Sequence, residues 1–262
     1  MICFRNLKDA DIFSKSDPMC VIFVQPFGED RWVEYQRTEH IMNTLNPDFS
    51  TKVVMSYHFE EQQNLKFELY DIDSVSKNLG DHDFLGQFTC SLGQIVSNGC
   101  LRKKLTATTT GEIILFVEEL SSSKTELKLQ FMGKKLDKKD WFGKSDPFLV
   151  FKKSTESGEW VVAYRTEPIK NTLNPVWKPF KVPVRTLCNG DYDRSLKVEC
   201  YDWNRNGSHE IIGEFFTTVN QLSQGAGPHN TYDLINKDYK VDNHTCTTRV
   251  SPICCMRQVR AQ

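Results

Sequence analysis

The stretch LKDADIFSKSDPM at residues 7–19 returns as LDKKDWFGKSDPF at residues 136–148, an offset of 129. Two further blocks repeat in the same order. RTEHIMNTLNPDF, which begins at Arg37, returns as RTEPIKNTLNPVW from Arg165. YDIDSVSKNLGDHDFLGQF, which begins at Tyr70, returns from Tyr201 as YDWNRNGSHEIIGEF, four residues shorter. Three blocks in one order at a nearly constant offset indicate two copies of one domain.

The length and composition suit two globular domains. The chain has 262 residues, and its 39% of apolar residues, with 17 Phe, supply enough side chains for two cores. We expect a first domain at 1–120, a second at 125–240, a short polar linker at 121–124 and a disordered tail at 241–262. The longest apolar runs are far shorter than the ~20 residues that a membrane span needs. The first residues lack the basic and apolar regions of a secretion signal.

Each copy predicts a β-sandwich. NLKFELY at 64–70 and SLKVECY at 195–201 alternate apolar and polar residues, which is typical of a strand with one buried face. Further short strands are expected at 20–24, 111–119, 125–131 and 148–151, and helices only at 91–97 and 218–223. Many short strands with turns between them predict an all-β fold of two antiparallel β-sandwich domains in tandem.

Neither the cysteine spacing nor any known catalytic motif in the sequence indicates an enzyme. The nine cysteines form no C-x-x-C pair, so we expect buried, reduced thiols in a cytosolic protein. The chain has no phosphate-binding P-loop, no G-x-S-x-G and no H-E-x-x-H. His82 and His209 are expected to shape loops rather than to act as bases. We therefore expect a binding protein and not an enzyme.

Acidic side chains recur in the loops of the first copy. They stand at strand ends beside Gly, Ser or Pro, which places them on neighbouring loops at one edge of a sandwich: Asp11, Asp17, Asp71, Asp73 and Asp83. Five converging carboxylates repel one another unless a cation neutralises them. Calcium prefers oxygen ligands, whereas zinc would call for Cys or His. The alternative is that single loop aspartates cap turns, but the number of recurring positions favours a calcium site.

The order D-x5-D-P, then N-T-L-N-P, then Y-D-x-D/N resembles the C2 domain, and its doubling over residues 1–240 resembles the tandem at the front of copines. The resemblance implies cytosolic proteins that bind anionic phospholipid membranes, the plasma membrane among them, when calcium rises. It also implies a second calcium site at Asp140, Asp146, Asp202, Asn204 and Glu210. Because Asn204 brings no charge where the family usually has Asp, we expect this site to be weaker than the first. Asp81 is the fallback for Asp83, since the third loop of the first copy is longer.

Apolar residues stand beside the ligands at the loop tips. They are candidates for insertion into the bilayer: Ile12, Phe13, Val75, Trp141, Phe142 and Trp203. Aromatic side chains suit the membrane interface, and an exposed Trp-Phe pair has no clear use in water. The alternative is that Phe13 and Phe142 pack under their own loops.

The charge of the chain is uneven. Residues 1–120 carry 11 basic and 18 acidic residues, whereas residues 121–262 carry 22 and 16. A polybasic face in C2 domains resembles a site for phosphoinositide headgroups, and the candidates here are Lys152, Lys153, Lys170, Lys178 and Lys181. Each basic residue near an anionic surface contributes about 1 kcal/mol. A solvated face is the alternative. Nucleic acid is a poor alternative, because the sequence has neither the fold signature nor the stacking platform of a nucleic-acid-binding domain.

The leading interpretation is a calcium-dependent phospholipid-binding module, and the alternative is a calcium-independent scaffold for protein partners with weak phosphoinositide binding.

Compared with copines, both ends look shortened. Only residues 2–4 precede the first loop of the first copy, and no strand like GEIILFVEEL ends the second. We expect the second sandwich to lack its last strand, which would leave an open sheet edge. Cys254-Cys255 is a candidate acylation site, although a frayed tail is favoured.

Overall fold

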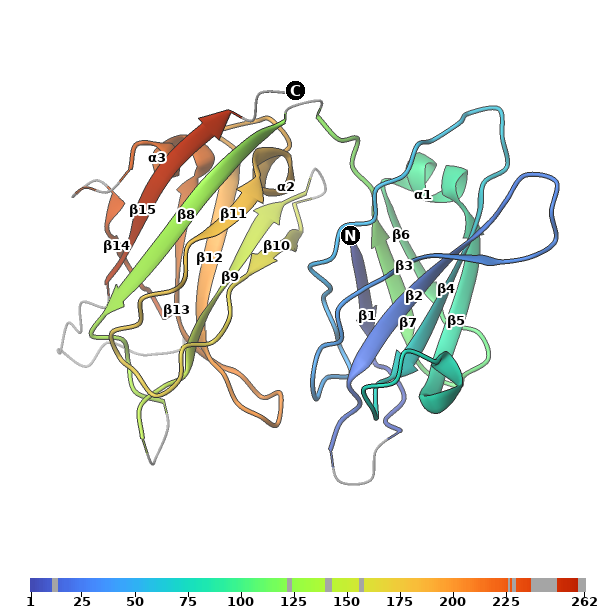
Figure 1. The fold of residues 1–262 in the computed structure, drawn as a ribbon, viewed down its shortest axis with the longest axis horizontal. Coiled ribbons are helices and arrows are strands. Elements are labelled where there is room, and N and C mark those ends of the chain that lie inside the picture. Colours follow the sequence, from blue (N-terminus) through green and yellow to red (C-terminus); the bar gives the residue numbers. More distant parts are fainter. Residues whose placement is uncertain are drawn as a thin grey trace. The chain divides into compact units, whose positions relative to one another are not determined.

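The computed structural model describes residues 1–10, 14–121, 124–139, 143–155, 158–225, 227, 230–236 and 249–258, the last range by its backbone alone. The chain divides into two compact units, of which the first comprises Met1–Glu119 and the second begins at Leu120. Each unit packs one β-sheet against another (Figure 1). The predicted all-β fold of two antiparallel sandwiches is confirmed. Among the described residues, no helix has the length and the apolar character to cross a bilayer.

In the first unit a four-stranded sheet, in the order β3-β2-β4-β5, faces a three-stranded sheet, in the order β1-β7-β6. The strands are β1 (Ile2–Arg5), β2 (Pro18–Gln25), β3 (Val33–Arg37), β4 (Asn64–Asp71), β5 (Asp83–Ser91), β6 (Cys100–Lys104) and β7 (Glu112–Phe116). A 3-10 turn, η1 (Leu79–Asp81), precedes β5, and helix α1 (Leu92–Asn98) follows it. α1 starts at a capping box in which Ser91 and Gln94 exchange hydrogen bonds.

The second unit repeats this plan with sheets β10-β9-β12-β13 and β11-β8-β15-β14. Its strands are β8 (Thr125–Lys134), β9 (Pro147–Ser154), β10 (Trp160–Arg165), β11 (Phe180–Pro183), β12 (Ser195–Asp202), β13 (Glu210–Thr218), β14 (Tyr232–Asp233) and β15 (Arg249–Gln258). Two helices complete it, α2 (Val184–Cys188) and α3 (Val219–Ser223). α2 is not predicted from the sequence, because its N-cap is Pro183 and has no side-chain capping bond.

β15 occupies the position at which the last strand of the second sandwich was predicted to be missing. It pairs with β8 along its length, from Arg249 opposite Lys134 to Gln258 opposite Thr125, and with β14 on its other side. β7 has the matching place between β1 and β6 in the first unit. The expectation of a missing strand and a disordered tail rested on the lack of a sequence similar to that of β7. Pairing through backbone N–H and C=O groups needs no such similarity.

Each unit has one apolar core between its sheets. In β4 every second residue is buried, as its alternating sequence predicts. The largest fully buried side chain of the second core is Trp177, and Phe49 takes the matching place in the first. Of the cysteines whose side chains the structure describes, Cys100 is partly exposed, and the five others are buried: Cys3, Cys20, Cys90, Cys188 and Cys200. All six are free thiols, as predicted.

Candidate functional site

The repeated N-T-L-N-P block shapes the loops at one end of each unit. Asn43 and Asn171, which precede its threonine, have φ angles of 54° and 53°, in the left-handed region that Asn tolerates better than most residues. In this conformation the backbone N–H of Asn43 donates to Asp17 Oδ1 at 2.7 Å, and that of Asn171 donates to Asp146 Oδ1 at 2.6 Å. The block therefore orients the aspartate of each Asp-Pro turn.

Asp17 and Asp71 are brought together in the first unit. The backbone N–H of Asp17 donates to Asp71 Oδ1 at 2.6 Å, and Asp71 is only 1% exposed. Asp71 ends β4, where Pro18 lies opposite it on one side and Asp83 on the other. Three of the predicted ligands thus stand at the same edge of one sheet, on neighbouring strand ends. Asp73 follows two residues later and is exposed, as is Asp83.

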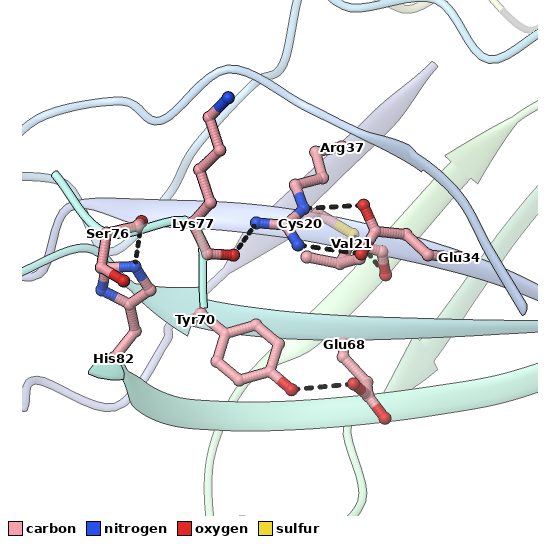
Figure 2. Close-up of polar contacts among 9 residues, drawn as sticks. All are labelled: Cys20, Val21, Glu34, Arg37, Glu68, Tyr70, Ser76, Lys77 and His82. Carbon is pink, nitrogen blue, oxygen red and sulfur yellow. Dashed lines mark hydrogen bonds and ion pairs between the residues drawn. The ribbon is translucent and has the colours of Figure 1, made fainter. Parts of the chain in front are cut away.

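The third loop of the first unit, residues 72–82, is held by its own polar contacts. His82 Nε2 lies 3.0 Å from the carbonyl oxygen of Ser76, and the hydroxyl of Ser76 donates to Asp81. Figure 2 shows Arg37 joining this loop to β3, because its guanidinium donates both to the carbonyl oxygen of Lys77 and to Glu34. Asp81, the fallback ligand, therefore belongs to the structure of its own turn, and His82 shapes the loop as expected.

The chemistry of the donors suits a hard cation, since all of them are carboxylates. Within the described ranges, no three His, Cys, Asp or Glu side chains are grouped closely enough to hold a metal ion. Asp11, the remaining predicted ligand of this unit, lies outside the described residues. Among the residues that the structure describes, no lysine or arginine forms an ion pair with Asp17, Asp73 or Asp83.

The second unit repeats the carboxylate pair. The backbone N–H of Asp146 donates to Asp202 Oδ1 at 2.6 Å, and Asp202 is fully buried at the end of β12, opposite Pro147 and Glu210. Asn204 stands where the first unit has Asp73. Its backbone N–H donates to His209 Nδ1 at 3.0 Å, and its amide nitrogen donates to the carbonyl oxygen of Ser208. Asp140 lies outside the described residues.

A lysine contacts the carboxylate pair of the second unit. Lys170 Nζ lies 2.8 Å from Asp146 Oδ2 and 3.5 Å from the ring centroid of Trp203. The Trp203 ring in turn stacks on His209, with 6.2 Å between ring centroids. Burial lowers the pKa of His209, and the positive charge of Arg165 lowers it further, which keeps the imidazole neutral and able to accept from Asn204. Lys170 is one of the predicted headgroup lysines, and its contact with Asp146 is not predicted by the sequence.

The predicted membrane anchors divide into two kinds. Val75 is fully exposed at 104% of its reference area, on the third loop of the first unit. Trp203 is half-buried by its contacts with Lys170 and His209. The remaining candidates lie outside the described residues: Ile12, Phe13, Trp141 and Phe142.

The predicted headgroup lysines do not share one face. Lys152 lies on β9 and forms an ion pair at 2.8 Å with Glu199 of β12, which also receives Lys197. Burial would raise the pKa of Glu199, but the hydrogen bonds from these two lysines outweigh it and keep the pKa below its usual value. Lys153 is buried. Lys181 is exposed on β11, in the other sheet, opposite the exposed Lys128 of β8, and the exposed Lys178 precedes β11.

The comparisons with known proteins agree with this architecture. The model of the C2 domain matches residues 1–106 and 129–234. Nicotinic receptor-associated protein 1 from Caenorhabditis elegans is 38% identical over 94% of this chain, which spans 46% of that relative. A solved structure of BON1-C2B is 30% identical, with a TM-score of 0.45 over 52% of this chain and 93% of that one. The calcium-bound pair of C2 domains from Extended-Synaptotagmin 2 is 16% identical, with a TM-score of 0.34 over 99% of this chain and 96% of that one. The chain therefore belongs to the C2 domain family, and within it to the copine family, as a tandem of two C2 domains.

Proposed function

We propose that the chain binds anionic phospholipid membranes, such as those rich in phosphatidylserine, in response to calcium and through the loops of the first unit. The observation that carries this proposal is the pair of Asp17 and Asp71, joined by a hydrogen bond of 2.6 Å at the same edge as Asp83. Without a cation these carboxylates repel an anionic surface. Bound calcium would cancel that repulsion and leave room for a lipid phosphate.

The proposed role is recruitment from the cytoplasm to the plasma membrane and other anionic membranes, and it includes no reaction. Asp17, Asp71, Asp73 and Asp83 would hold the calcium ion, and Asp11 is the further candidate. The exposed Val75 would then enter the lipid headgroup region. Pelleting with vesicles to the same extent with and without calcium would instead favour the calcium-independent scaffold.

Asp73→Asn tests the proposal, because it gives the first unit the residue that the second unit has at Asn204. The exposed Asp73 does not support the fold, so the variant should stay folded. We expect it to raise the calcium concentration needed for half-maximal pelleting with phosphatidylserine vesicles by about tenfold, since ligand charge tunes calcium affinity. The measurement is co-sedimentation across a calcium series, with chelator as the zero point.

Asp30→Asn is the matched control, because Asp30 is also exposed but follows β2, at the other end of the first unit. It should pellet like the parent chain. If the parent chain fails to pellet in calcium while its circular dichroism shows folded β-structure, the proposed function is wrong.

A separate prediction concerns the lysines of the second unit. Lys152→Met removes a partner of the buried Glu199, so we expect it to destabilise this unit by about 1–3 kcal/mol. Phosphoinositide binding should stay within twofold. Lys181→Met should leave stability unchanged and weaken binding about fivefold, which corresponds to the ~1 kcal/mol of one basic residue near an anionic surface. Thermal melts measure stability, and vesicle pelleting without calcium measures binding. If Lys152→Met instead weakens binding more than Lys181→Met does, the headgroup site lies on β9.

A further inference from the structure

Lys170 lies at a position where the two units differ within closely matching blocks. The first block contains Met42-Asn43 where the second contains Lys170-Asn171. Asn43 and Asn171 share a left-handed backbone conformation, and each donates its N–H to the aspartate of the Asp-Pro turn. Met42 and Lys170 therefore occupy equivalent places in two turns of the same shape, and only the second turn carries a cation beside its carboxylate.

The ammonium group of Lys170 has two favourable contacts. It lies 2.8 Å from Asp146 Oδ2 and 3.5 Å from the centroid of the Trp203 ring. Cation–π attraction adds to the ion pair and offsets part of the entropic cost of fixing the lysine side chain. In the first unit Ile72 stands at the position of Trp203, so neither the cation nor its aromatic support is present in that sequence.

The loops at this end of the second unit also carry less negative charge than those of the first. In the first unit, residues 7–17, 37–43 and 70–83 carry eight acidic and four basic residues. The matching residues of the second unit, 136–146, 165–171 and 201–210, carry six of each. A surplus of negative charge, which a divalent cation would neutralise, exists only in the first unit.

The donors of the second unit do not suit calcium in this arrangement. One oxygen of Asp146 contacts an ammonium group, and Asn204 brings no charge and directs its amide nitrogen to the carbonyl oxygen of Ser208. We propose that Lys170 is a built-in counter-ion of the second unit, which takes the place of calcium charge at Asp146 and leaves the calcium response to the first unit. The inference rests on the proposed function only in assigning calcium to the first unit.

Lys170→Met tests the inference in the full chain with terbium as the probe for the cation. The excitation is set at the long-wavelength edge of the indole band, where tyrosines such as Tyr70 beside Asp71 do not absorb. Trp203 then sensitises terbium bound beside it, whereas the first unit has Ile72 at that position, so the signal reports the second unit. A single positive charge about 4 Å from a trivalent terbium ion opposes binding on the order of a hundredfold in a water-like dielectric, and salt screening lowers this value. We expect Lys170→Met to lower the terbium concentration at half-maximal emission by at least tenfold, and Lys170→Met with Asn204→Asp to lower it further.

Met42→Lys is the reciprocal variant and should raise the calcium concentration for half-maximal binding to the first unit by a similar factor, measured by calorimetry without lipid. Lys124→Met is the charge-matched control, because the exposed Lys124 precedes β8 at the end of the second unit away from these loops. It should leave both titrations unchanged. If Lys170→Met shifts the terbium midpoint by less than twofold, or no more than Lys124→Met does, the inference is overturned. Because the titrations contain no vesicles, failure of membrane binding alone would count against the proposed function and not against this inference.

Discussion

Trp177→Ala is expected to destabilise the second unit by about 3–5 kcal/mol, the usual cost of deleting a large buried aromatic side chain. Trp177 is fully buried, and its core neighbours include Phe131 and Leu129. Its indole N–H also donates to the carbonyl oxygen of Pro147 at 3.2 Å. The substitution therefore removes core volume and frees the turn that carries Asp146. Hydrogen exchange followed by mass spectrometry measures the loss of protection unit by unit.

Two further variants test how much of this loss comes from the hydrogen bond and whether it is confined to one unit. Trp177→Phe introduces the residue that the first unit has at Phe49, so it keeps most of the ring and loses the bond to Pro147. We expect it to cost about 1–2 kcal/mol, a smaller loss that is typical of a buried hydrogen bond. Phe49→Ala should lower protection in β2, β4 and β5 and spare β9 and β12. Equal loss of protection in both units after Trp177→Ala would show that they unfold as one block, contrary to this expectation.

Much of the fold was predictable because it depends on local patterns. The period of two in residues 64–70 and 195–201 predicted β4 and β12, and the structure extends each by a single aspartate. Asn-Pro and Asp-Pro turns marked the strand ends that position Asp17 and Asp146. Two elements were not predicted, for different reasons. β15 is held by long-range backbone pairing to β8, which needs no distinctive sequence. α2 is a single short turn after Pro183 without a side-chain cap, so its sequence gives no start signal.

The candidate site was predictable in its residue types and less so in its contacts. That Asp17 and Asp71 lie together follows from the register of β2 and β4. The ion pair of Lys152 with Glu199 joins neighbouring strands whose pairing the sequence analysis did not assign, so the lysine was taken for a free one. Lys170 had a usable signal, since a cation replaces Met42 in an otherwise closely matching block. Its place inside the repeated block, one residue before Asn171, separates it from Lys178 and Lys181, which follow the block.

The two units thus place related loops under different charge. Asp73 and Met42 in the first correspond to Asn204 and Lys170 in the second, and both changes make the second loop end less negative. Each unit buries one aspartate at the matching strand end, Asp71 in the first and Asp202 in the second. The difference in charge therefore does not come from the fold. It comes from exposed loop positions, where substitutions cost little stability. Such positions are the ones at which two copies of a domain can acquire different calcium responses.

Val75→Glu is expected to weaken calcium-dependent binding to phosphatidylserine vesicles by tenfold to a hundredfold. Val75 is fully exposed on the third loop, between Asp73 and the segment that Arg37 holds. Burying a valine side chain contributes about 1.5–3 kcal/mol, which is one to two decades in affinity. Val75→Ser removes the apolar contact without adding charge, so its loss of vesicle affinity should be smaller than that of Val75→Glu. Co-sedimentation at saturating calcium across a lipid series measures both.

The choice of control decides which end of the first unit meets the membrane. Phe27 and Phe59 are also exposed, at 85% and 87%, but they precede β3 and β4 at the end of the sandwich opposite to Asp17 and Asp71. Apolar area alone would make these phenylalanines the stronger anchors. If the carboxylates direct docking, however, Phe27→Glu should bind vesicles within twofold of the parent chain, since its end of the unit does not change charge with calcium. A large loss for Phe27→Glu together with a small one for Val75→Glu would mean that the opposite end docks, and the role proposed for the aspartate loops would be wrong.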